Sequence, residues 1–267
     1  MNWLRPLGRT GLDVSAVGLG TVKLGRAMGV KYPKRFTIPD DDAAARLIDK
    51  ARELGINLID TAPAYGSSES RLGQLLAGQR DDWVICSKVG EEFDNGESRF
   101  DFSPEHTRIS VERSLRRLAT DVIDIVLVHS DGNDLDIIRR MGTLEALAGL
   151  KQRGLVRAIG MSTKTVEGGL AAAQQADVVM LTYNPGQREE EPVLEACARH
   201  QTGALIKKAL ASGHLAADPA QQQIKSVQAS LDLIFAHPGT TAAIIGTISE
   251  SHLESNVLAA QRALAKA

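Results

Sequence analysis

Cysteine is scarce in this sequence, which has two of them, Cys86 and Cys197, among 267 residues. Two cysteines exclude a disulfide-stapled scaffold, and their separation matches no metal-binding spacing. Cys86 lies in an apolar run that we expect to be a core strand, where a free thiol packs as a small hydrophobic group. The six histidines are scattered, and no pair has a metal-ligand spacing beside a carboxylate at a strand end. A metal-dependent hydrolase or isomerase is therefore poorly supported, and we expect no metal site.

A dominant charge of one sign is also missing. Lysine and arginine (31) nearly balance aspartate and glutamate (33), and the net charge of -2 predicts no general attraction to nucleic acid or to membranes. No apolar run is long enough to span a bilayer, and residues 1–6 lack the apolar region of a signal peptide. We therefore expect a cytoplasmic protein. With 43% hydrophobic and 24% charged residues, the composition is that of an ordinary globular enzyme.

Short apolar runs alternate with amphipathic helical stretches along the whole chain. The runs that we interpret as strands cover residues 16–20, 57–60, 83–88, 124–129, 155–161, 178–183, 203–207 and 242–246. Helical patterns cover residues 40–54, 68–78, 104–118, 140–153, 164–175, 189–200, 219–236 and 249–265. Eight strand–helix units in a chain of this length predict a single (β/α)8 TIM barrel domain over residues 1–267. A doubly wound open sheet shares the alternation and is the alternative.

Three segments lie outside the eight units. Residues 4–14 come first, with Gly8 and Gly11 bracketing a tight turn, and we predict a short N-terminal β-hairpin that closes the barrel floor. Loops at 22–39 and 89–102 are longer than a barrel connection needs and follow strands, so they should stand over the catalytic face. The second loop carries three of the five phenylalanines in the chain. These rings either form a wall of the substrate site or anchor the loop to the barrel rim.

A chemically coherent set of polar side chains stands at successive strand ends. Asp60 ends the second predicted strand, and Tyr65 follows it closely. Lys88 ends the third strand and His129 ends the fourth. The carboxyl ends of barrel strands meet at one face, where such folds keep their catalytic groups. We therefore expect these four residues to come together there.

This combination suits proton transfer to a carbonyl oxygen or, in reverse, from an alcohol. A tyrosine has an ordinary pKa of about 10 and donates a proton poorly without help, while a nearby ammonium lowers that pKa. Tyr65 would be the acid, Lys88 the ammonium, and Asp60 the carboxylate that holds it. His129 could orient the substrate oxygen or relay a proton. Taken singly, each of the four has a plain structural explanation as a turn cap, a packing ring, a surface charge or a rim histidine.

The motifs around these residues resemble those of the aldo-keto reductases, and the similarity covers almost the whole chain. The matching segments are Leu7–Ser15, Gly18–Thr21, Asn57–Gly73, Ser114–Leu118, Asp121–His129 and Gly154–Ser162. The stretch from Asp60 to Tyr65 is highly specific, whereas Gly18-Leu19-Gly20 alone would be a weak signal. The resemblance implies a (β/α)8 barrel that binds a nicotinamide dinucleotide, usually NADPH, without a Rossmann domain. It also implies Tyr65 as general acid, Lys88 and Asp60 as its modulators, and His129 as the group that orients the carbonyl.

The cofactor contacts that the resemblance implies are less well matched. They are Gly20, Thr21, Asp60, Ser162, Thr163, Lys207, Lys208, Leu210, Ser212, Gly246, Thr247, His252 and Asn256. The family's Ser-Asn pair for the carboxamide is Ser162-Thr163 here, and a glutamine expected on the sixth strand is Met180. Lys207 stands where many members stack a tyrosine on the nicotinamide. It cannot stack like a ring, but with Lys208 it would suit a pyrophosphate, and we expect at least one of the two to face solvent.

The segment for the adenosine end departs further from the family pattern. Basic residues that typically hold the 2′-phosphate are missing at Gly246 and Ile248, and His252 occupies a position often held by arginine. Thr247 and the N-terminus of the last helix could donate to phosphate oxygens, and Asn256 suits an adenine contact. We therefore expect NADPH as the cofactor, with NADH as the alternative.

Together these features predict an NADP-dependent aldo-keto reductase that reduces aldehyde or ketone carbonyls to alcohols. The alternative is a nucleotide-binding regulatory or sensor protein on the same barrel with little turnover. The altered carboxamide and stacking positions favour that alternative, and the intact catalytic set opposes it. We expect a small carbonyl substrate, no nucleic-acid or membrane partner, and a monomer, which is the family's common state. One sequence cannot name the substrate, because the rim loops set specificity.

Overall fold

The eight predicted strands close into one parallel barrel in the computed structural model, which describes residues 3–30, 32, 35–211 and 220–267. The barrel strands are β3 (Val17–Gly20), β4 (Leu58–Asp60), β5 (Val84–Val89), β8 (Ile123–His129), β9 (Val156–Ser162), β10 (Val178–Thr182), β11 (Gly203–Lys207) and β12 (Ala242–Ile245). They pair in this order, and β12 pairs with β3 to complete the ring. The closure excludes the open-sheet alternative, because an open sheet ends in two edge strands.

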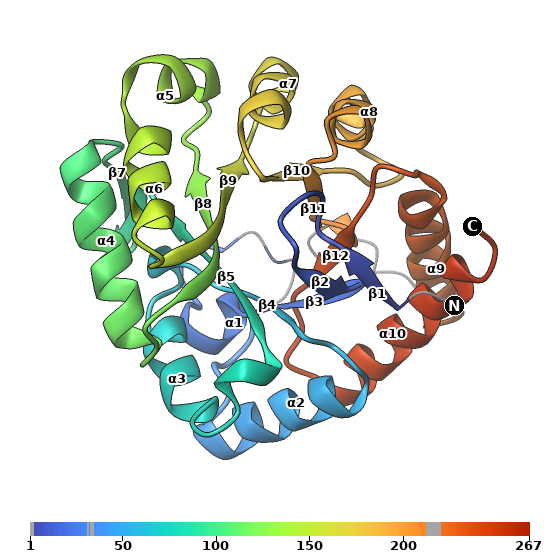
Figure 1. Cartoon of the computed structure of the whole chain (residues 1–267). Coiled ribbons are helices and arrows are strands. Elements are labelled where there is room, and N and C mark those ends of the chain that lie inside the picture. The colour runs from blue at the N-terminus through green and yellow to red at the C-terminus, as the bar shows by residue number, and fades with distance from the viewer. Residues whose placement is uncertain (1–2, 31, 33–34, 212–219) are drawn as a thin grey trace.

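Helices form an outer ring around the strands (Figure 1). They are α2 (Asp41–Glu53), α3 (Ser68–Leu75), α4 (Pro104–Arg117), α6 (Thr143–Gln152), α7 (Val166–Gln175), α8 (Glu191–His200), α9 (Ala220–Ala236) and α10 (Glu250–Leu264). Local residues set their ends. Ser103 accepts a hydrogen bond from the His106 N–H at the start of α4. Gly55 and Gly154, both with a φ of 76°, follow α2 and α6 in the left-handed conformation that ends helices.

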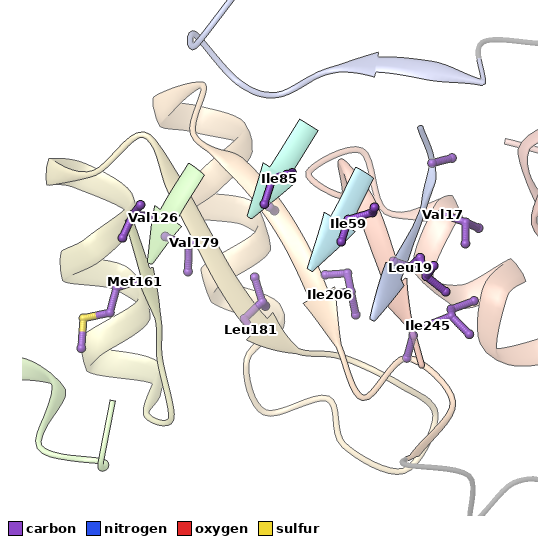
Figure 2. Close-up of a cluster of buried hydrophobic side chains, with 14 of the residues drawn as sticks. Val17, Leu19, Ile59, Ile85, Val126, Met161, Val179, Leu181, Ile206 and Ile245 are labelled. Carbon is purple, nitrogen blue, oxygen red and sulfur yellow. The ribbon is translucent and has the colours of Figure 1, made fainter. Parts of the chain in front are cut away.

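The strand side chains divide into two buried clusters, because successive residues of a strand point to opposite faces. The outward cluster packs under the helices and includes the side chains labelled in Figure 2, which are Val17, Leu19, Ile59, Ile85, Val126, Met161, Val179, Leu181, Ile206 and Ile245. The inward cluster fills the barrel and includes Leu58, Cys86, Ile125, Leu127, Ala158, Val178, Met180, Leu205 and Ala242. A side chain at the carboxyl end of a strand therefore faces the barrel mouth when it continues the inward series, which means that it lies two residues after an inward-facing residue of the same strand.

The predicted N-terminal hairpin closes the barrel floor. β1 (Leu4–Pro6) and β2 (Asp13–Ser15) pair antiparallel. Leu7, directly after β1, belongs to the inward cluster and is 0% exposed. A Cβ on Gly8 would lie 2.5 Å from the backbone nitrogen of Gly203, the first residue of β11. The hairpin thus covers the amino ends of the strands and leaves the opposite mouth open for a site.

Parts of the two long loops are folded, which the sequence analysis did not anticipate. The first loop contains the short helix α1 (Val22–Gly25), and the second forms the antiparallel pair β6 (Glu91–Asp94) and β7 (Glu97–Phe100). Asn95-Gly96 joins β6 to β7 with φ values of 50° and 91°, a two-residue turn that favours a hairpin. Shorter additions are α5 (Asp134–Arg140) and the 3-10 helices η1 (Pro63–Tyr65) and η2 (Arg80–Asp82).

Candidate active site

Three of the predicted catalytic residues face the inside of the barrel because they continue the inward series of their strands. Asp60, Lys88 and His129 each stand two residues after an inward-facing member of β4, β5 or β8. Side chains two residues apart share a face, so all three point into the barrel mouth. The strands β4, β5 and β8 are neighbours in that order. The structure therefore brings these residues together as predicted.

A buried ion pair forms the base of the site. Lys88 Nζ lies 2.5 Å from Asp60 Oδ1 and donates a second hydrogen bond to the Thr61 carbonyl oxygen at 2.9 Å. The Lys88 and Asp60 side chains are 1% and 5% exposed. Burial by itself would lower the pKa of Lys88, but its interactions with Asp60 and Tyr65 outweigh burial and raise that pKa. Lys88 is therefore an ammonium throughout the neutral pH range.

Tyr65 enters the site from η1, the short helix that follows β4. Gly66 ends this helix with a φ of 60°. A Cβ on Gly66 would lie 2.2 Å from the Gly25 carbonyl oxygen, so the turn requires glycine both for its conformation and for the close approach of α1. This turn places the Tyr65 ring centroid 4.9 Å from Lys88 Nζ. The His129 ring lies edge-on to Tyr65, with 6.3 Å between the ring centroids.

Lys88 shifts the acidity of Tyr65 in the predicted direction, but burial is the stronger influence. Burial disfavours the phenolate and raises the pKa of Tyr65, Lys88 lowers it, and the net pKa lies above the ordinary value of about 10. The prediction of an acidified phenol is therefore wrong, because one ammonium that is itself neutralised by Asp60 cannot offset the loss of water. At neutral pH the hydroxyl keeps its proton, which is the state that a proton donor needs.

His129 has a carboxylate against one of its ring nitrogens. Glu91 Oε2 lies 2.7 Å from His129 Nδ1, although out of line with the ring N–H. Burial lowers the pKa of His129, Glu91 opposes this shift, and Lys88 and Lys207 add to it, so the net pKa is below the ordinary value. His129 is therefore a neutral imidazole at pH 7, in contact with an anion.

No motif in the sequence marks Glu91, which lies on β6 directly beyond β5. Ser98 Oγ donates a hydrogen bond to the Glu91 carboxylate at 2.6 Å, and the Arg26 guanidinium lies 3.7 Å from it. Burial alone would raise the pKa of Glu91, but these two groups and His129 lower it to about 2. Glu91 is therefore an anion at neutral pH. The Asn95-Gly96 turn could have revealed the hairpin, but no sequence signal pairs Glu91 with a histidine on another strand.

A cavity of about 760 Å³ opens above the catalytic side chains, within the usual size range of ligand pockets. Its lining contains the predicted catalytic residues Asp60, Tyr65, Lys88 and His129. The lining also contains the predicted cofactor residues Gly20, Thr21, Ser162, Lys207, Lys208, Leu210, Gly246, Thr247, His252 and Asn256. Thr163 is buried and lies outside the lining. Ser212 falls outside the described residues.

The phenylalanines of the second loop anchor that loop. Phe102 is 6% exposed, and Phe100 stacks on it with 6.0 Å between the ring centroids. The guanidinium carbon of Arg26 lies 3.4 Å from the Phe93 ring centroid, which ties the first loop to the hairpin. The cavity lining includes the aromatic ring of Tyr32 but none of these three rings. Of the two explanations that the sequence left open, the structure supports anchoring.

The two adjacent lysines at the end of β11 differ in environment. Lys207 Nζ reaches the end of β9, where it donates to Ser162 Oγ at 3.0 Å and to the Thr163 carbonyl oxygen at 2.5 Å. Burial lowers the pKa of Lys207 to about 8, although Glu190 partly opposes this shift. Lys208 is exposed and has a φ of 53°, so it is the more solvated of the two, and it also lines the cavity. An ammonium thus occupies the place where the family pattern has an aromatic ring.

The lining suits a dinucleotide anion. Among the described lining residues, Lys88 and Asp60 are paired with each other, and the other lysine and arginine side chains are Lys23, Lys207, Lys208 and Arg262. Glycines line the wall where β3 and β12 end, and a Cβ on Gly246 would lie 3.3 Å from the Tyr32 hydroxyl oxygen. The residues present therefore leave room and positive charge for phosphates. Arg262 lies beyond His252 and Asn256 on α10, and no sequence motif marks it.

Neither a metal centre nor a membrane segment is found in the part of the chain that the structure describes. No three His, Cys, Asp or Glu side chains there are grouped so that they could hold a metal ion. Across the same residues, every helix is too short or too polar to cross a bilayer.

Known proteins resemble this chain over most of its length. The model of the aldo/keto reductase family matches residues 16–232. The uncharacterized oxidoreductase YqkF of Bacillus subtilis is 31% identical over 230 residues, which cover 84% of this chain and 70% of that protein. The L-galactose dehydrogenase of Arabidopsis thaliana is 41% identical over 60% of this chain and 48% of that protein.

The similarity extends to solved structures. A crystal structure of a Pseudomonas aeruginosa protein classed as an aldo-keto reductase is 56% identical to this chain and has a TM-score of 0.88. The match covers 98% of this chain and 96% of that one. On the extent of these matches, the chain belongs to the aldo/keto reductase family, whose members are oxidoreductases that use nicotinamide cofactors.

Proposed function

We propose that this protein is an NADP-dependent reductase that converts aldehyde or ketone carbonyls to alcohols. The observation that carries the proposal is the Tyr65 ring beside the Lys88–Asp60 ion pair, at the base of a cavity of about 760 Å³. A reduced nicotinamide, when bound, supplies a hydride to the carbonyl carbon. The side chains of this protein have to bind the substrate oxygen, donate its proton and keep the charges in place.

Tyr65 is the proposed general acid. Its hydroxyl is protonated at neutral pH, because burial raises its pKa. When the proton moves to the developing alkoxide, Lys88 stabilises the phenolate that remains. Asp60 holds the Lys88 ammonium at 2.5 Å before any substrate binds, so no reorganisation of this charge is needed during the reaction. His129 lines the cavity beside Tyr65 and orients the substrate oxygen.

The remaining wall of the cavity is the proposed cofactor site. Ser162 and Lys207, at the ends of β9 and β11, would contact the nicotinamide carboxamide. Thr247 and the N-terminus of α10 would donate to phosphate oxygens, and Asn256 would contact adenine. Arg262 adds a cation on the same helix, which supports NADPH over NADH because the extra 2′-phosphate is an anion.

A Tyr65→Phe variant tests the proposed acid by removing a single oxygen atom. We expect turnover to fall by at least about a hundredfold, while cofactor affinity stays within a few-fold. Fluorescence titrations with NADPH and NADH should come first, followed by steady-state rates on a panel of carbonyl compounds with the tighter binder. Tyr183→Phe is the matched control, because the Tyr183 hydroxyl donates to Glu191 away from the cavity. Unchanged turnover in Tyr65→Phe would rule out the proposed acid.

A regulatory or sensor protein with little turnover is the second candidate. Met180 and Lys207 line the cavity where the family pattern has an amide and an aromatic ring. Because two of the expected cofactor contacts are replaced, the cofactor would be held differently, and this difference favours the sensor candidate. The same titrations and rates discriminate the two, because a sensor binds cofactor without measurable turnover. The relative named L-galactose dehydrogenase makes sugars a necessary part of the panel, assayed in the oxidative direction.

A further inference from the structure

Lys207 places an anchored positive charge at the wall of the cavity. Its Nζ donates to Ser162 Oγ at 3.0 Å and to the Thr163 carbonyl oxygen at 2.5 Å. Within the described part of the cavity wall, Asp60 is the single carboxylate, and it is already paired with Lys88. The Lys207 ammonium therefore borders the cavity with both of these hydrogen bonds made to uncharged oxygens.

The register of the barrel strands places this charge close to the proposed reaction centre. Ser162, which accepts a hydrogen bond from Lys207, is aligned with His129 on the neighbouring strand, and adjacent strands lie about 4.8 Å apart. In the function proposed above, Tyr65 and His129 border the position of the substrate oxygen. A hydride passes between atoms about 3–3.5 Å apart. A nicotinamide ring that reaches the substrate carbon therefore lies in the part of the cavity that Lys207 borders.

The two forms of a nicotinamide ring differ by one positive charge, because the oxidised ring is a cation and the reduced ring is neutral. An ammonium held beside the ring repels the first form and not the second. We propose that Lys207 is a specificity-determining residue that makes the site bind the reduced dinucleotide more tightly than the oxidised one. The proposal rests on the proposed function for the place of the nicotinamide ring. In a reaction that consumes the reduced form, this selectivity favours release of the oxidised product.

Contacts with the phosphates cannot produce this selectivity. The phosphates are the same in both forms of the dinucleotide, so a cation that attracts them changes both affinities by the same factor. This holds for Arg262 on α10 and also for the attraction that Lys207 itself exerts on the phosphates. The ratio of the two dissociation constants, oxidised over reduced, therefore isolates the effect of the charge on the ring.

The selectivity should depend on pH, because the charge on Lys207 does. Burial lowers the pKa of Lys207 to about 8. The other charged side chains that act on it are two anions that favour the ammonium and two cations that disfavour it, namely Glu190, Asp134, Lys208 and Lys164. His129 on β8 is already neutral above pH 7, because its pKa lies below the ordinary value. Between pH 7 and pH 9 the ratio should therefore fall as Lys207 loses its proton.

Calorimetric titrations with NADPH and NADP+ test the proposal without substrate or turnover. At pH 7 the ratio of dissociation constants should be about tenfold larger in the wild type than in Lys207→Met. At pH 9 the two proteins should converge, because the wild-type lysine is then mostly neutral. Lys207→Arg keeps its charge at every pH used, so its ratio should stay high at pH 9. Arg262→Met is the matched control and should leave the ratio unchanged.

The outcomes are distinct. Equal ratios in the wild type and Lys207→Met at pH 7 overturn the proposal. A wild-type ratio that stays constant from pH 7 to pH 9 overturns it as well, and this measurement needs no variant. So does a change of ratio in Arg262→Met as large as the change in Lys207→Met. If the ratios behave as expected but no carbonyl compound is turned over, the selectivity of Lys207 is supported and the proposed reductase function fails.

Discussion

Replacement of Lys88 by methionine tests the ion pair on which the proposed chemistry depends. In Lys88→Met the Asp60 carboxylate, which belongs to a residue 3% exposed, loses the Nζ partner that lies 2.5 Å away. Removal of one partner from a buried ion pair typically costs about 3–5 kcal/mol. We expect a loss of this size in the free energy of unfolding at pH 7, measured by urea denaturation, together with loss of turnover.

A second substitution separates the unpaired charge from the loss of packing. Lys88→Met combined with Asp60→Leu removes both charges and leaves apolar side chains in their place. Because such replacements of buried pairs are often close to neutral, the double variant should recover most of the lost stability. It should not recover activity, since the ammonium beside Tyr65 is still missing. The recovery of stability without activity is the signature of the buried pair.

The stability of the wild type should also depend on pH at the alkaline end. The pKa of Lys88 is raised in the folded protein above the value of about 10.4 for an unfolded chain. Its contribution to stability is therefore complete below pH of about 10 and is lost as the pH rises through the folded pKa. Lys88→Met should lack this dependence. A destabilisation below about 1 kcal/mol, or a double variant no more stable than the single one, would refute the reasoning.

Two further predictions concern the turn that carries Tyr65 and the cofactor wall. Gly66→Ala should destabilise the protein by more than about 1 kcal/mol and reduce turnover, because a Cβ there would lie 2.2 Å from the Gly25 carbonyl oxygen. Gly78→Ala is the control for backbone strain alone, because Gly78 has a φ of 77° and a Cβ there would have nothing within 4 Å. If Gly66→Ala and Gly78→Ala lost the same free energy of unfolding, the close approach of Gly66 to Gly25 would be unimportant. NADPH should bind more tightly at pH 6 than at pH 8 in fluorescence titrations, because Lys207 loses the positive charge that attracts the phosphates as the pH rises through its pKa of about 8. Equal affinity for NADH and NADPH across this range would count against a 2′-phosphate contact by His252.

The barrel and the gathering of its strand-end residues could be predicted because both follow from local patterns. A short continuous apolar run closed by a polar residue identifies a buried strand and its carboxyl end. It therefore places Asp60, Lys88 and His129 at one mouth without any knowledge of the packing. The Asn95-Gly96 turn was equally local and readable, but a long loop between two barrel units conceals a hairpin unless the turn itself is recognised.

Other features depend on which segments meet in space. Glu91 reaches His129 only because the hairpin folds back against η1, and Lys207 reaches Ser162 only because β11 and β9 flank the same strand. Pairings of this kind join residues far apart in the chain, so no spacing in the sequence marks them. Arg262 joins the cavity wall for the same reason.

The sequence by itself determined which side chains stand at the barrel mouth, because an apolar run and the polar residue that closes it are neighbours in the chain. Only the tertiary structure decided how those side chains titrate. The pKa of Tyr65 is raised and not lowered because burial, which depends on the whole fold, outweighs the single ammonium that the sequence could place beside it.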